Sequence, residues 1–354
     1  MHVQALRWHG RGDLRLEEIA EPGEPPAGYA VVEVAFCGIC GTDLHEITHG
    51  PNMIRTGKHP LSGQAPPVTM GHEMSGRVVA LGGERAGVEI GTRVAVDPCL
   101  TCDECRWCLH GDYHICAKGG SVGLASDGGF ARYATVPLRG LHPVPDGVSD
   151  EMAALAEPLA VGLHAASRAG VGPGDTVLVL GAGPIGIAAI LGARMSGAGA
   201  VYVSEPVTAR HAAAVAAGAT EVFDPTTADV RRTVFLRTGR IGPDVAIDAT
   251  GRPDAVDLGL RSLRRGGRMA VAGITEAALS VDVRQLVLYE RSLCGSLGYN
   301  FDIPRVLALM ADGRLDASCL LTGVRPLSEG LAVVDELTGR THDHLKVLLT
   351  PEKA

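Results

Sequence analysis

Short apolar runs separated by turn residues dominate the first 150 residues of the chain. The segments 30–35 and 77–80 are examples, each rich in valine and alanine, and glycine and proline lie between such runs. Closely spaced strands with turn signals between them are typical of antiparallel sheet. The pattern predicts a mostly-β region with long loops.

The rhythm of apolar positions changes near residue 150. An alanine-rich stretch with few helix breakers predicts a helix over residues 150–169. An apolar run at 176–180 then predicts a short buried strand, and comparable runs follow at 201–204, 244–248 and 268–272. Helical segments lie between these runs, which indicates βαβ units on a parallel sheet.

The last 60 or so residues leave this alternation, with a helix expected near 303–311 and a closing strand at 345–349. A chain of 354 residues is long enough for two domains, each with its own core. We therefore expect an α/β protein. Its predicted parts are a mostly-β domain over residues 1–152, a doubly wound parallel-sheet domain over 153–293, and a C-terminal segment, 294–354, that returns to the first domain.

Composition indicates which classes of partner and which cellular compartment to expect. A hydrophobic content of 46% with 20% charged residues is typical of a globular protein, and the net charge of −8 argues against nucleic acid or an anionic membrane as partner. The apolar region 176–203 is broken by glycines, a proline and an arginine, so it predicts strand, turn and helix rather than a membrane span. Nine cysteines and an N-terminus without a signal-like apolar stretch predict a reducing, cytoplasmic location.

Four cysteines, Cys102, Cys105, Cys108 and Cys116, are separated by two, two and seven residues. Such short gaps let one loop place four thiolates around a tetrahedral ion, which predicts a closed structural zinc site. The alternative is disulfide pairing or idle thiols, and clustered cysteines in a chain without an export signal argue against it.

A glycine turn follows the predicted strand 176–180 directly and opens a helix. Its residues are Gly181, Gly183, Pro184, Ile185 and Gly186. Glycines at this spacing allow a tight turn, close approach of the backbone to a pyrophosphate and close helix–strand packing. The amino end of the helix then offers N–H groups to the phosphates. The turn predicts a dinucleotide site of the Rossmann type, whereas an ordinary turn is the alternative.

Glu205 stands at the end of the next predicted strand, nineteen residues after Gly186. A carboxylate there can accept both hydroxyls of the adenosine ribose and would repel a 2′-phosphate, which favours NAD over NADP. The nearby Arg210 keeps dual specificity open. A solvated acid at the end of a strand is the alternative interpretation of Glu205.

A second group of metal-ligating residue types is scattered along the chain. Cys40 and His72 could each be an ordinary core residue, which is the commoner fate of both types. Glu157, however, lies in an otherwise apolar stretch, where a buried carboxylate is costly without a cation. One thiolate, one imidazole and one or two carboxylates would bind zinc and leave a position open for water or substrate, which is the catalytic pattern.

These motifs together resemble the zinc-dependent medium-chain alcohol dehydrogenases over essentially the whole chain. The resemblance rests on residues 40–45, 71–73, the four-cysteine loop, 157–159 and the glycine turn, in that order. Within the superfamily the chain looks most like the 2,3-butanediol dehydrogenases, with sorbitol and threonine dehydrogenases as relatives. The resemblance implies a GroES-like catalytic domain, a Rossmann domain and a homodimer or homotetramer joined through the nucleotide domains.

The resemblance also implies roles for individual residues. Cys40, His72 and either Glu73 or Glu157 would bind a catalytic zinc, with the two glutamates exchanging as ligands during turnover. Asp43 would orient His72.

For the proton and the cofactor, the resemblance implies further roles. Thr42 would accept the proton of the substrate hydroxyl and pass it, through the nicotinamide ribose, to His45 near solvent. A turn hydrogen bond of Thr42 and a surface position of His45 are the alternatives. The remaining residues would hold NAD, at its adenosine half Ile185, Glu205 and Arg210, and near its nicotinamide Gly273 and Leu297.

The expected reaction is NAD-dependent oxidation of a secondary alcohol, such as a small vicinal diol, or reduction of the matching hydroxyketone. The four-cysteine loop also fits the sorbitol and threonine branch, so a polyol, cyclitol or threonine dehydrogenase is the second hypothesis. A third is a non-catalytic protein that binds NAD and zinc, since fold alone does not establish function. The intact set Thr42, His45 and zinc ligands argues against the third.

Overall fold

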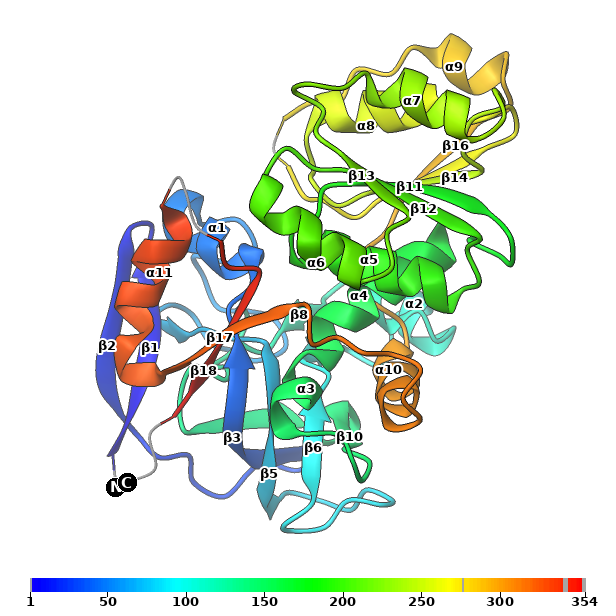
Figure 1. The fold of residues 1–354 in the computed structure, drawn as a ribbon. Helices are drawn as coiled ribbons and strands as arrows, with labels where there is room; N and C mark the ends of the chain where they lie inside the picture. Colours follow the sequence, from blue (N-terminus) through cyan, green and yellow to red (C-terminus); the bar gives the residue numbers. More distant parts are fainter. Residues whose placement is uncertain (1, 276, 340–342, 352–354) are drawn as a thin grey trace. The chain divides into compact units, whose positions relative to one another are not determined.

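The computed structural model describes residues 2–275, 277–339 and 343–351 (Figure 1). The chain divides into two compact units, each made of several segments. The first unit comprises residues 1–157, 303–311 and 321–354, and the second comprises 158–302 and 312–320.

The main sheet of the first unit has seven strands. Six of them follow the order β10-β6-β5-β3-β18-β17, and β9 also pairs with β3. Their bounds are β3 Tyr29–Gly38, β5 Glu73–Leu81, β6 Arg93–Val96, β9 Tyr133–Pro137, β10 Leu141–Pro143, β17 Leu321–Pro326 and β18 Lys346–Thr350. The closing strand β18 lies between β3 and β17 in this sheet.

Strand β3 brings distant segments of the chain together at its carboxyl end. Gly38, the last residue of β3, pairs with Glu73 of β5 on one side and with Leu348 of β18 on the other. Lys346 and Glu73, 273 positions apart in sequence, thus reach the same end of the sheet.

Two small sheets complete the first unit. One has the order β2-β1-β4, with bounds β1 His2–Gly10, β2 Asp13–Ala20 and β4 Val68–Thr69, and the other pairs β7 Cys99–Leu100 with β8 Gly120–Ser121. The core of the first unit is formed by buried residues such as Leu6, Trp8, Val32, Met74 and Phe130. Successive side chains of a strand point to opposite faces, and the face that packs on the core must be apolar. The short apolar runs in this part of the sequence therefore predicted strands.

The second unit contains a six-stranded parallel sheet of order β13-β12-β11-β14-β15-β16. Numbered within the unit, this is the order 3-2-1-4-5-6 of a doubly wound dinucleotide-binding fold. The strands are β11 Thr176–Leu180, β12 Ala200–Ser204, β13 Glu221–Phe223, β14 Val245–Asp248, β15 Arg268–Val271 and β16 Ser292–Gly295. The predicted fold class, a mostly-β part with a doubly wound parallel sheet, is confirmed.

Helices connect the strands. In the first unit they include α1 Gly41–His49, α2 Arg106–Leu109, α3 Asp150–Ala154 and α11 Gly330–Thr338. The second unit has α5 Pro184–Met195, α6 His211–Ala216, α7 Val230–Arg237, α8 Pro253–Ser262 and α9 Val283–Val287, while α4 Ala156–Arg168 and α10 Asp302–Ala311 each begin at a boundary between the units. Among the described residues no helix is long and apolar enough to cross a membrane.

The single helix predicted over residues 150–169 is wrong, because the structure divides it at Leu155 into α3 and α4. Proline lacks an N–H and clashes with the preceding turn, so it is tolerated only near the start of a helix. Pro158 lies in the first turn of α4. The break therefore places Pro158 where a helix accepts it, and it sets Glu157 at the amino end of the second helix.

Candidate metal centres and cofactor site

The four cysteines of the loop come together in the structure. Their sulfur atoms lie 3.4 to 4.0 Å apart in the contacts among Cys102, Cys105, Cys108 and Cys116. A disulfide would need about 2.05 Å, whereas four sulfurs at about 2.3 Å from a central zinc would be separated by about 3.8 Å. The spacing of the sulfurs fits a tetrahedral metal site.

The ionisation of these thiols points to the same conclusion. Backbone N–H groups lower the pKa of Cys105 to about 6, whereas burial and the neighbouring thiols raise that of Cys108 to about 12. Four clustered sulfurs cannot all carry negative charge without a cation between them. A divalent metal would relieve this repulsion, so the donor set fits zinc.

A second cluster of donors lies in the first unit. One donor atom each from Cys40, His72 and Glu73 lies within 4.8 Å of the other two. Cys40 immediately precedes α1, while His72 and Glu73 lie at the start of β5, beside the end of β3. Mixed sulfur, nitrogen and oxygen donors from separate segments are typical of a catalytic zinc site, so this set also fits the metal.

Asp43 lies beside the imidazole ring of His72. The Asp43 carboxylate accepts a hydrogen bond from the Cys40 backbone N–H at 2.9 Å, and its other oxygen lies 3.4 Å from His72 Nδ1. Burial alone would lower the pKa of His72, but the charges of Asp43 and Cys40 raise it well above its ordinary value. Asp43 thus lies where the resemblance placed it, beside the imidazole.

Lys346 is the residue of this centre that the sequence analysis missed. Its ammonium donates to both oxygens of Glu73, at 2.6 and 2.7 Å, and to the Ile39 carbonyl at 2.9 Å. Lys346 and Glu73 are both fully buried. A side chain on Gly38 would overlap Glu73, since a Cβ there would lie 2.1 Å from the carboxylate oxygen. A lysine inside the apolar run 345–349 was the available signal, because a buried ammonium needs an anionic partner.

Glu157 lies close to this cluster but is not one of its three members. Although the residue keeps some exposed surface, the pKa of its carboxyl is raised to about 8, mainly by burial. The charges of His72 and Lys346 oppose this rise, whereas the charge of Glu73 contributes to it. Glu73 already has an ammonium partner, whereas a cation would stabilise the charged form of Glu157.

The two residues predicted to move a proton lie on α1, directly after Cys40. Thr42 and His45 are both partly exposed. The Nδ1 atom of His45 lies 2.9 Å from the side-chain amide nitrogen of Asn52, and the ring stacks on His49 with centroids 5.1 Å apart. A donating amide makes Nδ1 an acceptor, which places the ring proton of neutral His45 on Nε2.

The glycine turn of the second unit joins β11 to α5. Gly181 has φ +91°, and a Cβ there would lie 2.7 Å from Thr250. A Cβ on Gly186 would lie 2.1 Å from the Gly181 carbonyl oxygen, whereas Gly183 faces open space except for Arg210 at 4.0 Å. Pro184 is the first residue of α5, and Ile185 beside it is partly exposed. The turn leaves the amino end of α5 accessible to a phosphate.

Glu205 lies against this turn and is buried, with 2% of its surface exposed. Its two oxygens accept hydrogen bonds from the backbone N–H groups of Ala182 at 2.6 Å and Val207 at 2.8 Å. Arg210 lies 3.9 Å from the carboxylate, and its buried Nε has no hydrogen-bond partner. A buried donor without a partner is costly, so the Arg210 Nε–H fits a hydrogen-bond acceptor that the bound cofactor would supply.

Gly273 and Leu297 follow the carboxyl ends of β15 and β16. The strands are parallel, so these residues lie at the same edge of the sheet as the glycine turn. Gly273 packs so closely that a Cβ would lie 2.0 Å from Gly251 N, while Leu297 is 48% exposed. Ligands of open α/β sheets bind at this edge.

Two family models match the chain. The alcohol dehydrogenase GroES-like domain matches residues 26–146, and the zinc-binding dehydrogenase domain matches residues 184–312. Together they correspond to the mostly-β part that carries both metal clusters and to most of the doubly wound sheet.

Curated proteins of known activity are similar along nearly their full length. An (R,R)-butanediol dehydrogenase of Bacillus subtilis is 37% identical over 90% of this chain and 91% of its own. A sorbitol dehydrogenase of the same organism is 30% identical over 99% of this chain and 98% of its own.

Solved structures agree with this fold. The 2R,3R-butanediol dehydrogenase of Bacillus subtilis superimposes with a TM-score of 0.90 at 35% identity, covering 99% of this chain and 100% of the other. A zinc-binding dehydrogenase of Sinorhizobium meliloti bound to NADP gives a TM-score of 0.90 at 29% identity, with 99% and 100% covered.

Proposed function

The chain belongs to the GroES-like, zinc-binding alcohol dehydrogenase family, and we propose that its substrate is a small vicinal diol, or the matching hydroxyketone in the reverse direction. The enzyme is an oxidoreductase that transfers hydride between a secondary alcohol and a nicotinamide cofactor. The observation that carries the substrate proposal is the similarity to butanediol dehydrogenases in both sequence and structure.

We propose that each chain holds one structural and one catalytic zinc. Cys102, Cys105, Cys108 and Cys116 would complete the tetrahedron of the first and leave it no open position. Cys40 and His72, with Glu73 or Glu157, would hold the second. When bound there, zinc supplies Lewis-acid chemistry that favours the negatively charged form of the alcohol oxygen.

The side chains of α1 then carry the proton. The Thr42 hydroxyl would accept the proton of the substrate hydroxyl and pass its own proton, through the nicotinamide ribose, to His45, which would release a proton to solvent. The contact with Asn52 fixes the ring of His45 and keeps Nδ1 as the acceptor. Asp43 holds His72, and Lys346 holds Glu73, so both candidate ligands keep a fixed orientation.

We propose NAD as the preferred cofactor. The carboxylate of Glu205 lies beside the glycine turn, where it would accept the ribose hydroxyls and repel a 2′-phosphate. Gly181, Gly183, Pro184, Ile185 and Gly186 would hold the pyrophosphate, while Arg210 would contact the adenosine ribose and Gly273 and Leu297 the nicotinamide end. Substitution of Glu205 by alanine should raise the KM for NAD about tenfold and improve the use of NADP.

The partner in assembly is a second copy of this chain. β16 lies at the edge of the parallel sheet, and Val283, Val287 and Leu288 beside it expose 63%, 68% and 64% of their surface. An open strand edge with exposed apolar side chains is suited to pairing, which supports a homodimer or homotetramer. The nine cysteines are all free thiols, which is consistent with a reducing compartment, and we place the enzyme in the cytoplasm.

The test is a comparison of initial rates of NAD reduction by zinc-loaded protein. The substrates are (2R,3R)-butanediol, meso-butanediol, sorbitol, myo-inositol and threonine. Turnover confined to the butanediols is expected. Turnover confined to sorbitol or myo-inositol would refute the diol and favour a polyol or cyclitol dehydrogenase, the second candidate, which the full-length similarity to a sorbitol dehydrogenase supports.

A further inference from the structure

A pocket of about 660 Å3 lies in the second unit, away from the glycine turn. Its lining includes Arg240, Arg265 and Arg291. These residues lie in the segments that lead into β14, β15 and β16, respectively. The strands of the sheet are parallel, so their amino ends share one edge, whereas the glycine turn follows the carboxyl end of β11. The pocket is therefore at the opposite edge of the sheet from the expected cofactor site.

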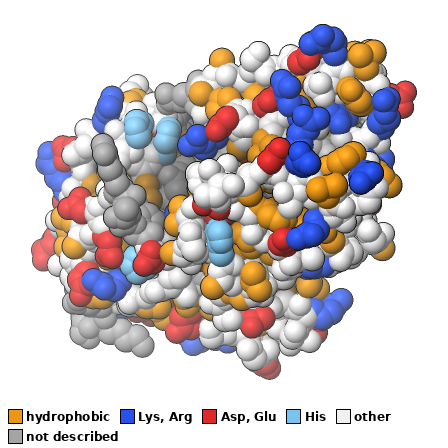
Figure 2. Space-filling model, turned by 45° about the horizontal axis from the view of Figure 1, so that its top comes forward, with side chains coloured by type: hydrophobic (Ala, Val, Ile, Leu, Met, Phe, Trp, Pro, Cys, Tyr) orange, Lys and Arg blue, Asp and Glu red, His pale blue; other side chains and the backbone are white. Residues whose placement is uncertain are grey.

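The charge of this pocket is strongly positive. Seven arginines and a single acid, Asp229, line it. Two of the arginines pair with acids outside the lining, Arg261 with Asp257 and Arg264 with Asp244. Seven positive charges thus face three negative ones, an excess of four, in a protein whose net charge is −8. Figure 2 shows Lys and Arg side chains crowded on the surface of this unit.

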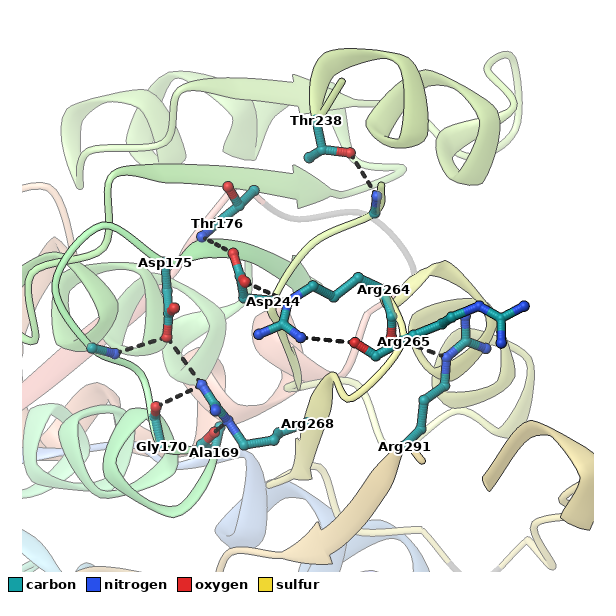
Figure 3. A network of polar contacts seen from close by, with 12 residues as sticks. Ala169, Gly170, Asp175, Thr176, Thr238, Asp244, Arg264, Arg265, Arg268 and Arg291 are labelled. Carbon is teal, nitrogen blue, oxygen red and sulfur yellow. Dashed lines mark hydrogen bonds and ion pairs between the residues drawn. The ribbon is translucent and has the colours of Figure 1, made fainter. Parts of the chain in front are cut away.

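Several of the arginines are held in place by neutral groups. Figure 3 shows Arg264, Arg265 and Arg291 close to one another. Arg264 donates to the Arg265 carbonyl at 2.7 Å, Arg265 donates to the Leu288 carbonyl at 3.4 Å, and Arg291 donates to the Leu263 carbonyl. These bonds satisfy donors and fix geometry, but a carbonyl does not cancel a charge.

Tyr289 holds two of the same cations. The guanidinium groups of Arg265 and Arg291 lie 4.8 and 4.6 Å from its ring centre. Arg231 and Arg265 are close enough to lower the pKa of Arg291, an effect that adds to the larger one of burial. Like charges held together without acidic partners indicate a place for an anion.

Three further arginines of the pocket lining are available to a ligand. Within the described part of the chain, Arg231, Arg232 and Arg240 form no ion pair with an acid, and all three are exposed. Phe235 and Ile241 beside them expose 41% and 64% of their surface. The volume is in the range of small-molecule sites, and planar guanidinium groups suit the oxygens of phosphate.

We propose that this pocket binds a small molecule carrying a chain of three or more phosphate groups, either free or esterified to a nucleoside. An excess of four charges matches such a ligand better than a single carboxylate or phosphate, because each phosphate group brings one or more negative charges. The fixed arginines supply the phosphate contacts, and Phe235 and Ile241 offer apolar surface to an organic group.

The experiment is isothermal titration calorimetry of the full-length protein, with NAD saturating the glycine-turn site. Inorganic tripolyphosphate, ATP, inorganic phosphate and a single-stranded oligonucleotide are titrated separately. Binding of one tripolyphosphate or ATP per chain is expected, with phosphate much weaker and with affinity that falls as salt is raised. Equal affinity for tripolyphosphate and ATP would assign recognition to the phosphate chain, and tighter ATP binding would show that the nucleoside contributes.

Variants locate the site. The double substitution Arg231→Gln/Arg265→Gln should weaken binding at least about tenfold, since charged hydrogen bonds are the strong ones. Arg231→Lys/Arg265→Lys should retain more affinity than the glutamine pair. Arg314→Gln is the matched control, because Arg314 is an exposed arginine of the same unit that pairs with Asp312 elsewhere.

Rates of NAD reduction by the variants show whether the fold is intact. The proposal is overturned if neither polyphosphate binds, or if binding is the same in wild type and in the glutamine pair. It is also overturned if only a single-stranded oligonucleotide binds, because the site would then serve a nucleic acid.

Discussion

The two metal clusters of the first unit are built in opposite ways. The four-cysteine loop collects identical donors from residues 102–116, and no described acid or base joins them as a fifth member. The other cluster collects Cys40, His72 and Glu73 from separate segments, with Lys346 of the closing strand bound to Glu73. The first arrangement suits an ion that stays, and the second suits an ion whose surroundings take part in a reaction.

The role of charge also differs between them. In the loop, the positive charge at the centre of the thiolates would come from the metal. In the mixed cluster, an ammonium already neutralises one carboxylate, while Glu157 has a pKa raised to about 8 mainly by burial. Four thiolates bind zinc in a closed shell, whereas a neutralised carboxylate leaves room in the shell for substrate.

The largest expected effect comes from breaking the mixed cluster. Replacement of Cys40 by serine should lower kcat for alcohol oxidation about 10³-fold or more, since the charge on the alcohol oxygen would lose its stabilisation. Zinc analysis by mass spectrometry should show that one equivalent is lost while the other remains. A variant with normal zinc content and normal kcat would show that Cys40 is not a ligand.

Breaking the ion pair behind this cluster should cost stability rather than only activity. Substitution of Lys346 by methionine leaves Glu73 buried without its counter-ion, so the free energy of unfolding should fall by about 3–5 kcal/mol. Urea unfolding of chelator-treated protein measures this, because no metal can then replace the ammonium.

The matched control is the double variant Glu73→Gln/Lys346→Met, which removes both charges. It should recover part of the lost stability. An unfolding midpoint of the single variant equal to that of wild type would contradict the role of the pair.

Breaking the four-cysteine loop should reduce stability more than activity. Replacement of Cys105 by serine should release one zinc equivalent and lower the free energy of unfolding by about 2 kcal/mol. At low temperature kcat should change by less than about threefold, because this ion does not contact substrate. A drop in kcat as large as that of Cys40→Ser would erase the distinction between the clusters.

The smallest expected effect is the contribution of His142 to the pH dependence of stability, which is distinct from any loss of metal at low pH. Burial lowers the pKa of His142 in β10 from 6.5 to about 4. The unfolded chain therefore takes up a proton below about pH 6.5 that the folded chain does not, so His142 costs stability as the pH falls from 6.5 towards 4. Between pH 7.5 and 5.5 the loss is about 1 kcal/mol.

Replacement of His142 by glutamine should remove that part of the pH dependence. Denaturant unfolding at the two pH values measures it. The same slope in the variant as in wild type would assign the acid sensitivity to other groups, such as the metal ligands.

The sequence predicted what depends on near neighbours. The strand at 176–180, the glycine turn after it and the four-cysteine loop all depend on local spacing, and the structure has each of them. The break at Leu155 was missed because the alanine-rich pattern was given more weight than Pro158, which fits only near the start of a helix.

Contacts between distant segments could not be obtained in the same way. The pairing of Lys346 with Glu73 depends on β18 and β5 both flanking the end of β3, and the arginine pocket depends on three loops meeting at the edge of a parallel sheet. Pattern and spacing do not report which strands become neighbours, so these features required the fold.

The separation of roles between the two metal sites can be tested by a zinc titration of metal-free protein in which activity and thermal stability are recorded together. Two equivalents should bind per chain, with NAD reduction appearing in proportion to one of them and most of the thermal stabilisation following the other. In Cys40→Ser, the stabilising equivalent alone should remain. Full activity in metal-free protein, or full activity with zinc confined to the four-cysteine loop, would contradict this separation of roles.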